Sequence, residues 1–350
     1  MLSDLTDTEL CRLFESHGFI TGSTAMLPIL RQARKAATVS DITVLLEGET
    51  GTGKQVLAQA IHNLDEKRKS FPFITVHCST VTEALAESEL FGHQRGAFSG
   101  ATRDREGLFR AAHRGTLFLD DVNDLPLALQ PKLLDVLQRG MIRGVGSDHE
   151  GNINVRIIAA ANQPLAPAVR ENRFRGDLYH RLNVVRLPLP PLRERSDDLP
   201  SLVLAFAARH RNIYPYITRI DGDLVEFLKS CTFHGNVREL EHAVERMLFA
   251  KTAGESLQLS DWTQQCCEAS PAEEGHDLVS QAAQRLWTAI FQHGVPYSEA
   301  IRRLERRLLE NAVRGCGQTR REIACRLHTS ERTLYHKLRS HNLTGQAVAD

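Results

Sequence analysis

The chain has 350 residues, enough for two or three domains, and its 43 basic and 43 acidic side chains leave no net charge that would point to a partner. A signal peptide and an apolar run of about 18 residues are both missing, which argues against secretion and membrane spanning. The 7 cysteines show neither metal-ligand nor Cys-x-x-Cys spacing, so we expect free thiols and a cytoplasmic protein.

A short helix and a loop open the chain. Residues 1–17 are typical of an amphipathic helix in which several leucines and Phe14 share one face. The loop at 18–23 precedes a second helical pattern. Pro28 must occupy the first turn of that helix, because proline lacks the N–H that an interior position needs.

A glycine-rich loop organises the rest of the chain. The stretch Gly48-Glu49-Thr50-Gly51-Thr52-Gly53-Lys54 follows an apolar strand pattern and precedes a helical one, the context that a phosphate-binding loop needs. Its backbone N–H groups would surround phosphates, and Lys54 would add a full positive charge. A plain glycine turn is the alternative, but it would not require a lysine directly after the last glycine. Gln55 stands where such loops usually place the Ser or Thr that binds Mg²⁺.

Polar side chains end two of the buried strands. We expect strands at 42–46, 73–76, 115–119, 155–161 and 184–187. In a parallel sheet the carboxyl ends of strands face the ligand crevice. We therefore expect Asp120 to hold Mg²⁺, usually through water, Asp121 to orient the attacking water, and Asn162 to bond the terminal phosphate or that water. Each of them taken singly could equally be a solvated strand end.

The stretch Gly96-Ala97-Phe98-Ser99-Gly100-Ala101 interrupts an otherwise helical region. Two glycines that bracket a phenylalanine indicate an inserted loop. A Phe98 exposed at the tip of that loop would need a partner to leave water. The alternative is that Phe98 packs in the core.

Arginines follow at three places that could reach a nucleotide. Arg175 and Arg181 lie shortly before the last strand, and arginine best stabilises the charge on a transferring phosphoryl group. Residues 196–262 are mostly helical, and Arg238 lies in the first turn of a helix that Asn236 is expected to cap. Any one of these arginines could be a plain surface charge.

The C-terminal stretch is basic and helical. Residues 299–343 hold 11 Lys and Arg against 5 Asp and Glu, a net charge of +6. Helices are expected at 301–313, 319–327 and 330–339, and the last two form a helix-turn-helix. Its candidate DNA contacts are Thr319, Ser330, Arg332, Thr333, His336 and Lys337. A helical oligomerisation bundle is the alternative.

Together these motifs resemble those of the bacterial enhancer-binding proteins, the AAA+ activators of sigma-54 RNA polymerase, from about Ile20 to Leu343. The most specific stretch is 96–101, which is similar to the family's GAFTGA loop that touches sigma-54, with Ser99 replacing Thr. The resemblance implies an α/β AAA+ P-loop ATPase without an N-terminal receiver domain. Its expected parts are a short N-terminal helix (1–17), a parallel-sheet ATPase subdomain (18–195), a helical lid (196–262), a linker (263–298) and a C-terminal all-α Fis-type helix-turn-helix domain (299–350).

The resemblance also implies individual roles. Residues 48–54 resemble the Walker A motif, and Asp120 and Asp121 resemble Walker B. Asn162 resembles sensor I, and Arg238 resembles sensor II. Arg175 and Arg181 resemble the arginine fingers that are offered to a neighbouring subunit, and Ile20 and Gly22 resemble the segment that packs on adenine.

Two departures concern hydrolysis. Asp121 stands where the family has Glu, and positioning errors of about 1 Å can cost ~100-fold in rate. His77 stands where the family has an Asn that switches that Glu, so His77 could compensate for the shorter acid.

The resulting hypothesis is a DNA-bound activator that assembles from dimers into a ring, for which the resemblance implies a hexamer, and uses Mg²⁺ and ATP to remodel sigma-54 RNA polymerase. A separate regulatory protein, or expression level, would control it. One alternative is a DNA-binding regulator whose AAA+ domain senses nucleotide but hydrolyses it weakly. The other is an AAA+ remodeller of a different protein client.

Overall fold

The computed structural model describes residues 5–79, 83–97, 103–147, 149–210, 217–251, 254–262, 291, 296–315 and 331–341. The chain divides into two compact units, Met1–Glu268 and Ala269–Asp350.

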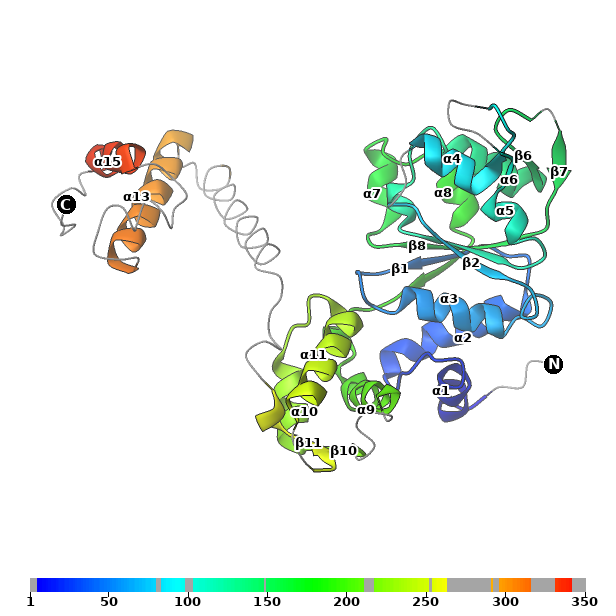
Figure 1. The fold of residues 1–350 in the computed structure, drawn as a ribbon. Coiled ribbons are helices and arrows are strands. Elements are labelled where there is room, and N and C mark those ends of the chain that lie inside the picture. The colour runs from blue at the N-terminus through cyan, green and yellow to red at the C-terminus, as the bar shows by residue number, and fades with distance from the viewer. Residues whose placement is uncertain are drawn as a thin grey trace. The chain divides into compact units, whose positions relative to one another are not determined.

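A parallel sheet forms the centre of the first unit (Figure 1). Among the described residues it has five strands in the order β2 (Phe73–His77), β5 (Thr116–Asp120), β8 (Arg156–Ala161), β1 (Val44–Glu47) and β9 (Val185–Pro188). Every neighbouring pair is parallel. All residues of β1 and β8 are buried. The apolar runs within them, 44–46 and 157–161, are of the kind that occurs where helices cover both faces of a sheet.

Helices do cover both faces (Figure 1). One face carries α1 (Asp7–Glu15), α2 (Leu27–Thr38) and α3 (Lys54–Asn63), and the other carries α4 (Glu83–Phe91), α5 (Leu108–Ala111), α6 (Gln130–Arg139), α7 (Leu165–Arg170) and α8 (Gly176–Leu182). Successive residues of β1 alternate between the two cores: Val44 and Leu46 pack in one, and Leu45 packs in the other.

Two antiparallel pairs interrupt this layered arrangement. They are β3 (Gly92–His93) with β4 (Arg105–Glu106), and β6 (Met141–Arg143) with β7 (Glu150–Asn152). The first pair brackets the predicted inserted loop, as expected for an insertion whose ends meet. Gly96 and Ala97 belong to the described residues, whereas Phe98, Ser99, Gly100 and Ala101 lie outside them.

A helical lid follows the sheet region. It contains α9 (Leu199–Arg209), α10 (Gly222–Ser230), α11 (Asn236–Ala250) and the short parallel pair β10 (Arg219–Ile220) and β11 (Ser256–Leu257). Its own apolar core includes Leu192, Phe206, Leu240 and Val244. Short 3-10 turns lie at Thr24–Met26, Val122–Asp124, Leu192–Glu194, Ser196–Asp198 and Leu259–Asp261.

The second unit is described at α13 (Tyr297–Gly315) and α15 (Glu331–Ser340). Ala300 and Leu309 of α13 are buried, as are Leu334 and Leu338 of α15. Other apolar side chains of the helix predicted at 301–313 stay exposed among the described residues, since Ile301 is 38% and Leu308 58% exposed. The predicted linker at 263–298 and helix at 319–327 lie almost wholly outside the described residues.

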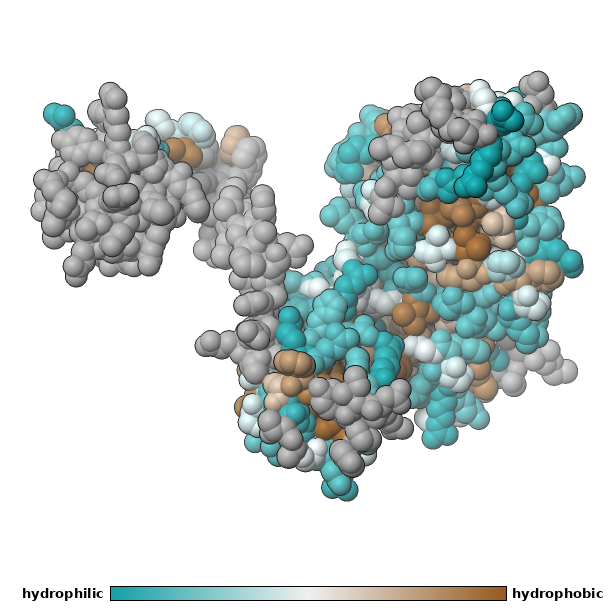
Figure 2. All heavy atoms as spheres, viewed as in Figure 1, coloured by the Kyte–Doolittle hydropathy of each residue, from teal (hydrophilic) through white to brown (hydrophobic). Residues whose placement is uncertain are grey.

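The predicted α/β fold with a parallel sheet and helical lid is therefore confirmed. Pro28 and Pro131 lie in the first turns of α2 and α6, as the missing proline N–H requires. The expected domain boundaries stay a prediction. On the face shown in Figure 2 the described residues are mostly hydrophilic, and brown apolar spheres gather in small patches. In the described part of the chain, none of the helices combines the length and the apolar character needed to span a bilayer.

Candidate nucleotide-binding site

A cavity of about 270 Å³ lies where the glycine loop, the carboxyl ends of the strands and the lid meet. It is lined by Thr50, Gly51, Gly53, Lys54, Gln55, Val56, Asp120, Asp121, Asn162, Val237, Arg238 and Glu241. The structure thus brings together the predicted phosphate loop, both strand-end carboxylates, Asn162 and the lid arginine, although they come from distant parts of the chain.

The glycine loop passes tightly against the lid. Gly51 has a φ of 79°, and a Cβ there would lie 2.2 Å from the Gly235 carbonyl oxygen. The Val237 N–H donates to the Gly51 carbonyl oxygen at 2.9 Å. Only glycine permits both the left-handed backbone and this approach, so Gly51 sets the distance between the loop and the start of α11.

Lys54 holds its ammonium group at the cavity wall. Its Nζ donates to the carbonyl oxygens of Gly48 and Glu49 at 2.7 and 3.0 Å and to Asn162 Oδ1 at 2.7 Å. Burial lowers the pKa of Lys54, and the nearby carboxylates of Asp120 and Asp121 oppose that shift. Phosphate oxygens could replace these acceptors without moving the lysine backbone.

Asp120 and Asp121 stand side by side at the end of β5. Burial raises the pKa of Asp120, and the like charge of Asp121 adds to the shift. Asp121 has a φ of 54°, and its N–H donates to Asp120 Oδ1 at 3.1 Å. The Asn162 amide nitrogen donates to Asp121 Oδ1. Asn162 therefore links Lys54 to Asp121 across the cavity.

His77 contacts a different carboxylate from the one that we expected. Its Nδ1 lies 3.3 Å from Asp120 Oδ2, because β2 pairs with β5 in a register that sets His77 opposite Asp120. Asp121 instead accepts from Asn162. The switch role that the resemblance implied for His77 toward Asp121 stays a prediction.

The wall formed by Asp120, Asp121 and Gln55 fits a magnesium ion. Mg²⁺ prefers oxygen ligands and is usually held by one or two carboxylates with substrate phosphates and waters. Both carboxylates face the same cavity, and their mutual repulsion contributes to the raised pKa of Asp120. A divalent cation would relieve that repulsion.

A second, smaller cavity of about 90 Å³ continues the first toward α9. The two cavities share Gly53, Val56, Val237 and Glu241. Phe19, Ile20 and Phe206 also line the smaller one, so it offers an apolar slot for a flat base. Gly22, which the resemblance placed on adenine, lines neither cavity, and its N–H donates to Asp198 Oδ1 at 2.7 Å.

Sequence reasoning missed the buried pair Arg195 and Asp198. Asp198 is fully buried and accepts from the Thr21 hydroxyl at 2.9 Å as well as from the Gly22 N–H. Arg195, only 2% exposed, donates to the Thr52 carbonyl oxygen at 2.6 Å and lines the smaller cavity. The pair joins the N-terminal loop, the glycine loop and the lid. These partners are 143 to 177 residues apart, so no local pattern marks them.

Asp198→Ala should lower the free energy of unfolding by about 3–5 kcal/mol, because it leaves Arg195 as a buried charge without its carboxylate. Urea unfolding would measure this. Asp197→Ala is the matched control, since Asp197 is exposed in the same turn. A loss below about 1 kcal/mol for Asp198→Ala, the range of a surface pair, would contradict the assigned role.

Glu49 bonds residues of the lid and does not line the larger cavity. Its carboxylate accepts from Arg193 at 2.6 and 2.8 Å and from the Asn236 amide at 3.2 Å. The Arg193 guanidinium holds the pKa of Glu49 below its ordinary value. Thr52 is buried and donates its hydroxyl to the Glu49 carbonyl oxygen. Of the predicted loop contacts, Gly48, Glu49 and Thr52 do not line the larger cavity.

The two predicted arginine fingers lie outside both cavities. Arg175 is 46% exposed and pairs with Asp177 at 2.8 Å. Arg181 is exposed and donates to the Leu137 carbonyl oxygen at 2.7 Å. Neither arginine lines the cavity of its own subunit, and their role toward a neighbouring subunit stays a prediction.

The predicted DNA contacts are only partly described. Thr333 and Lys337 are exposed on α15, and Lys337 pairs with Glu305 of α13. Arg332 and His336 belong to α15. Thr319 and Ser330 lie outside the described residues.

Two family models match the chain. The model described as "Sigma-54 interaction domain" matches residues 19–188, and that described as "AAA+ ATPase lid domain" matches residues 193–278. Among curated proteins, the "Transcriptional regulatory protein GlrR" of Escherichia coli is 48% identical over 231 residues, which are 65% of this chain and 51% of GlrR. The "Nitric oxide reductase transcription regulator NorR1" of Cupriavidus necator is 39% identical over 304 residues, 85% of this chain and 58% of NorR1.

Solved structures agree with these matches. The crystal structure of NtrX from Brucella abortus in complex with ATP aligns with a TM-score of 0.63 at 28% identity, covering 92% of this chain and 69% of NtrX. The chain spans about half the length of the curated relatives that it matches. The residues that line the larger cavity all fall within the two matched domains. The chain therefore belongs to the bacterial enhancer-binding proteins, the AAA+ transcriptional regulators built on a sigma-54 interaction domain.

Proposed function

We propose that the protein is a sigma-54-dependent transcriptional activator that hydrolyses ATP to remodel the RNA polymerase closed complex. One observation carries the proposal: Lys54, Asp120, Asp121, Asn162 and Arg238 converge on a single cavity. The domain match from 19 to 188 and the transcription regulators among its relatives support the sigma-54 partner. The ATP complex of NtrX supports the nucleotide.

The cavity suggests how this chain's residues divide the work. The base would enter the apolar slot beside Ile20 and Phe206, and the phosphates would follow the glycine loop to Lys54. The Lys54 ammonium would exchange its present carbonyl acceptors for phosphate oxygens. Asp121 would accept a hydrogen bond from the attacking water and orient it, while the Asn162 amide fixes the Asp121 carboxylate.

Asp120 would hold Mg²⁺, which supplies charge neutralisation to the phosphates when bound. Arg238 would approach the phosphates from the lid, because α11 begins against the glycine loop. The start of α11 is fixed there by the Val237 hydrogen bond, so nucleotide binding and lid position would be coupled.

A neighbouring subunit would complete the site. Arg175 lies exposed at the start of α8, and Arg181 lies exposed within α8. Both could reach the cavity of the next copy in a ring. An arginine finger of this kind contributes about 10³–10⁵-fold to turnover in other phosphoryl-transfer enzymes. We therefore propose a homo-oligomer, from dimer to hexamer, with ATP at each interface.

The C-terminal helices would bind double-stranded DNA upstream of the promoter, with α15 as the recognition helix. A separate regulatory protein would control the activator, which would act in the cytoplasm. Malachite-green phosphate release tests the enzyme part: purified protein should hydrolyse ATP, and turnover should rise steeply with protein concentration as the ring forms.

Phe98→Ala should leave ATP turnover and DNA binding largely unchanged but abolish activation, because the proposed loop acts on sigma-54 and not on the nucleotide. Transcription in vitro from a sigma-54 promoter measures this. Phe249→Ala is the control, because it removes a phenylalanine that is 86% exposed on α11 of the lid, outside the loop, and it should retain most activity. An unaffected promoter in the Phe98→Ala reaction would exclude the loop as the effector.

The two alternatives make different predictions. A nucleotide sensor would show near-zero turnover that Asp121→Glu raises strongly, because the longer acid would restore the usual reach. A remodeller of another client would hydrolyse ATP without any dependence of its output on sigma-54. The sigma-54 interaction domain match favours neither alternative.

A further inference from the structure

The two cavities of the candidate nucleotide-binding site meet at a shared wall. Four described residues line both the cavity of about 270 Å³ and the apolar slot of about 90 Å³, namely Gly53, Val56, Val237 and Glu241. Glycine has no side chain and the two valines are apolar, so Glu241 is the member of this set that brings a polar group to the wall. If the base occupies the slot and the phosphates follow the glycine loop, the sugar that joins them must lie at this wall.

The place of Glu241 is fixed relative to the glycine loop. Glu241 follows Val237 by four residues on α11, so the two side chains share one face of the helix. The Val237 N–H donates to the Gly51 carbonyl oxygen at 2.9 Å, which anchors the start of α11 on the glycine loop. Glu241 is therefore held one helical turn beyond the anchored residue, beside the proposed path of the phosphates.

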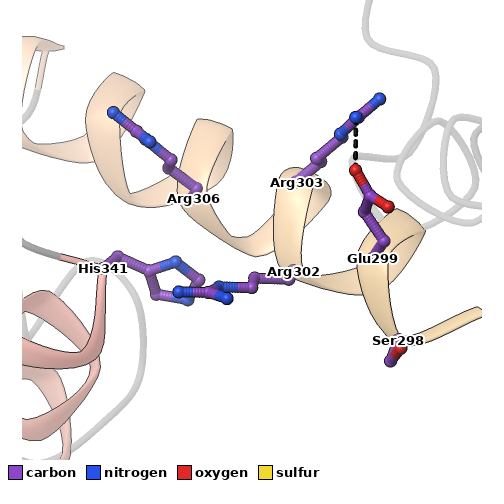
Figure 3. A pocket seen from close by; sticks show the side chains of 6 residues that line it. All are labelled: Ser298, Glu299, Arg302, Arg303, Arg306 and His341. Carbon is purple, nitrogen blue, oxygen red and sulfur yellow. Dashed lines mark hydrogen bonds and ion pairs between the residues drawn. The ribbon is translucent and has the colours of Figure 1, made fainter.

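Arg209 holds the Glu241 carboxylate at the slot. Its guanidinium, at the end of α9, pairs with Glu241 Oε1, and its Cζ lies 5.1 Å from the centroid of the Phe206 ring, which also lines the slot. Figure 3 shows a different kind of pair in the second unit, where Arg303 and Glu299 lie one turn apart on the same helix, an arrangement common on helix surfaces. The Arg209–Glu241 pair instead joins two helices, and both of its partners line the slot.

A carboxylate at the shared wall is suited to a ligand that offers O–H donors. The negative charge of Glu241 would repel the phosphates of a nucleotide, but Arg209 offsets that charge. A carboxylate has about four acceptor sites, so Glu241 can accept further hydrogen bonds while it stays paired, and its 32% exposure leaves room for an approaching ligand. A ribose carries two neighbouring hydroxyls, and acidic side chains bond ribose hydroxyls in other nucleotide-binding folds.

We propose that Glu241 accepts hydrogen bonds from the ribose hydroxyls of the bound nucleotide and thereby selects ribonucleotides over deoxyribonucleotides. The inference rests on the nucleotide binding proposed above and adds a residue that determines specificity for the sugar. Arg209 is a positioning residue in this arrangement, because it orients the carboxylate and has no acceptor of its own for a hydroxyl.

Calorimetric titration of the full chain with ADP and with dideoxy-ADP, which lacks both ribose hydroxyls, tests the proposal. Both probes lack the phosphate that the site would remove, so binding is measured without turnover, and neither carries a label on the ribose. The wild type should bind ADP about 10-fold more tightly than dideoxy-ADP, the lower end for hydrogen bonds to a charged group, because Glu241 is partly exposed. In Glu241→Ala the two Kd values should become nearly equal.

Glu245→Ala is the matched control. Glu245 is exposed one turn further along α11, lies 3.5 Å from the His210 ring and lines neither cavity, so the ratio of the two Kd values should stay that of the wild type. Each ratio compares two ligands on one protein, so a general loss of affinity or of folded protein cancels out of it.

Three results would overturn the proposal while leaving nucleotide binding itself intact. They are equal Kd values for the two probes in the wild type, a wild-type ratio that survives in Glu241→Ala, and an equal fall of the ratio in Glu245→Ala. If the wild type bound neither probe, the nucleotide-binding part of the proposed function would fail as well.

Discussion

Lys54→Ala is expected to lower ATP turnover by at least ~10³-fold, the largest effect that we predict for a single side chain. Removing one preorganised donor from a developing charge costs about 10²–10³-fold in other enzymes, and Lys54 contributes a full charge at the end of the glycine loop. Its Nζ already lies among three acceptors that phosphate oxygens would replace. Steady-state phosphate release would measure the loss.

Lys54→Ala also removes the donor to Asn162, so the fold must be checked separately. Thermal unfolding should show a modest loss at most, because Lys54 itself lines the cavity, so water can enter the space that its side chain leaves. Lys69→Ala is the control, since Lys69 is exposed and pairs with Glu66 one turn earlier. A folded Lys54→Ala protein that retained a tenth of wild-type turnover would show that this cavity is not the site of ATP hydrolysis.

Asp121→Asn should reduce kcat by about 10²–10⁴-fold, the usual contribution of a general base, while the Kd for ATP changes less than about 3-fold. The amide keeps the shape of the side chain and an oxygen that can still accept from Asn162. It loses only the negative charge that would orient and polarise the attacking water. Phosphate release and the binding of a fluorescent ATP analogue would separate the two quantities.

Asp124→Asn is the matched control for this change. Asp124 lies three residues further along, in the following 3-10 turn, and is exposed. A kcat that survives in Asp121→Asn, or a Kd that rises as much as kcat falls, would exclude Asp121 as the residue that orients water. Asp121→Glu is a second test. If the wild-type protein showed near-zero turnover and Asp121→Glu raised it strongly, the wild type would be a nucleotide sensor and not an active ATPase.

The architecture around the cavity was accessible from the sequence because its signals are local. Continuous apolar runs mark buried parallel strands, and the structure places strands within a few residues of each predicted run. Glycine spacing with Lys54, and the carboxylates at the end of one strand, predicted which side chains would meet. They do meet, because the carboxyl ends of β5 and β8 lie at the same edge of the sheet as the glycine loop.

The buried charged residues around the cavity could not be predicted from the sequence, because each depends on a partner that is distant in the chain. Glu49 looks like a phosphate-loop residue, but it turns to Arg193, which is 144 residues away. Arg156 begins a strand and is almost fully buried, because Asp65, 91 residues earlier, neutralises it at 2.7 Å. A single charged residue in sequence is more often a surface group. Burial of such charges becomes visible only once their partners are placed.

The carboxylate partner of His77 shows the same limit on a smaller scale. The sequence places His77 near the acidic pair but does not say which acid it meets. The register of β2 against β5 decides this, since it pairs His77 with Asp120. Register is set by the packing of both faces of the sheet, so a one-residue shift would have turned His77 away from the site.

Permanganate footprinting of a sigma-54 promoter, with ATP and with a non-hydrolysable ATP analogue, would show whether ATP hydrolysis drives open-complex formation. We expect reactive thymines at the start site with ATP, and none above background with the analogue or with the Lys54→Ala protein. Equal promoter melting with the analogue would contradict this expectation, because the energy for remodelling would then not come from hydrolysis in the cavity described.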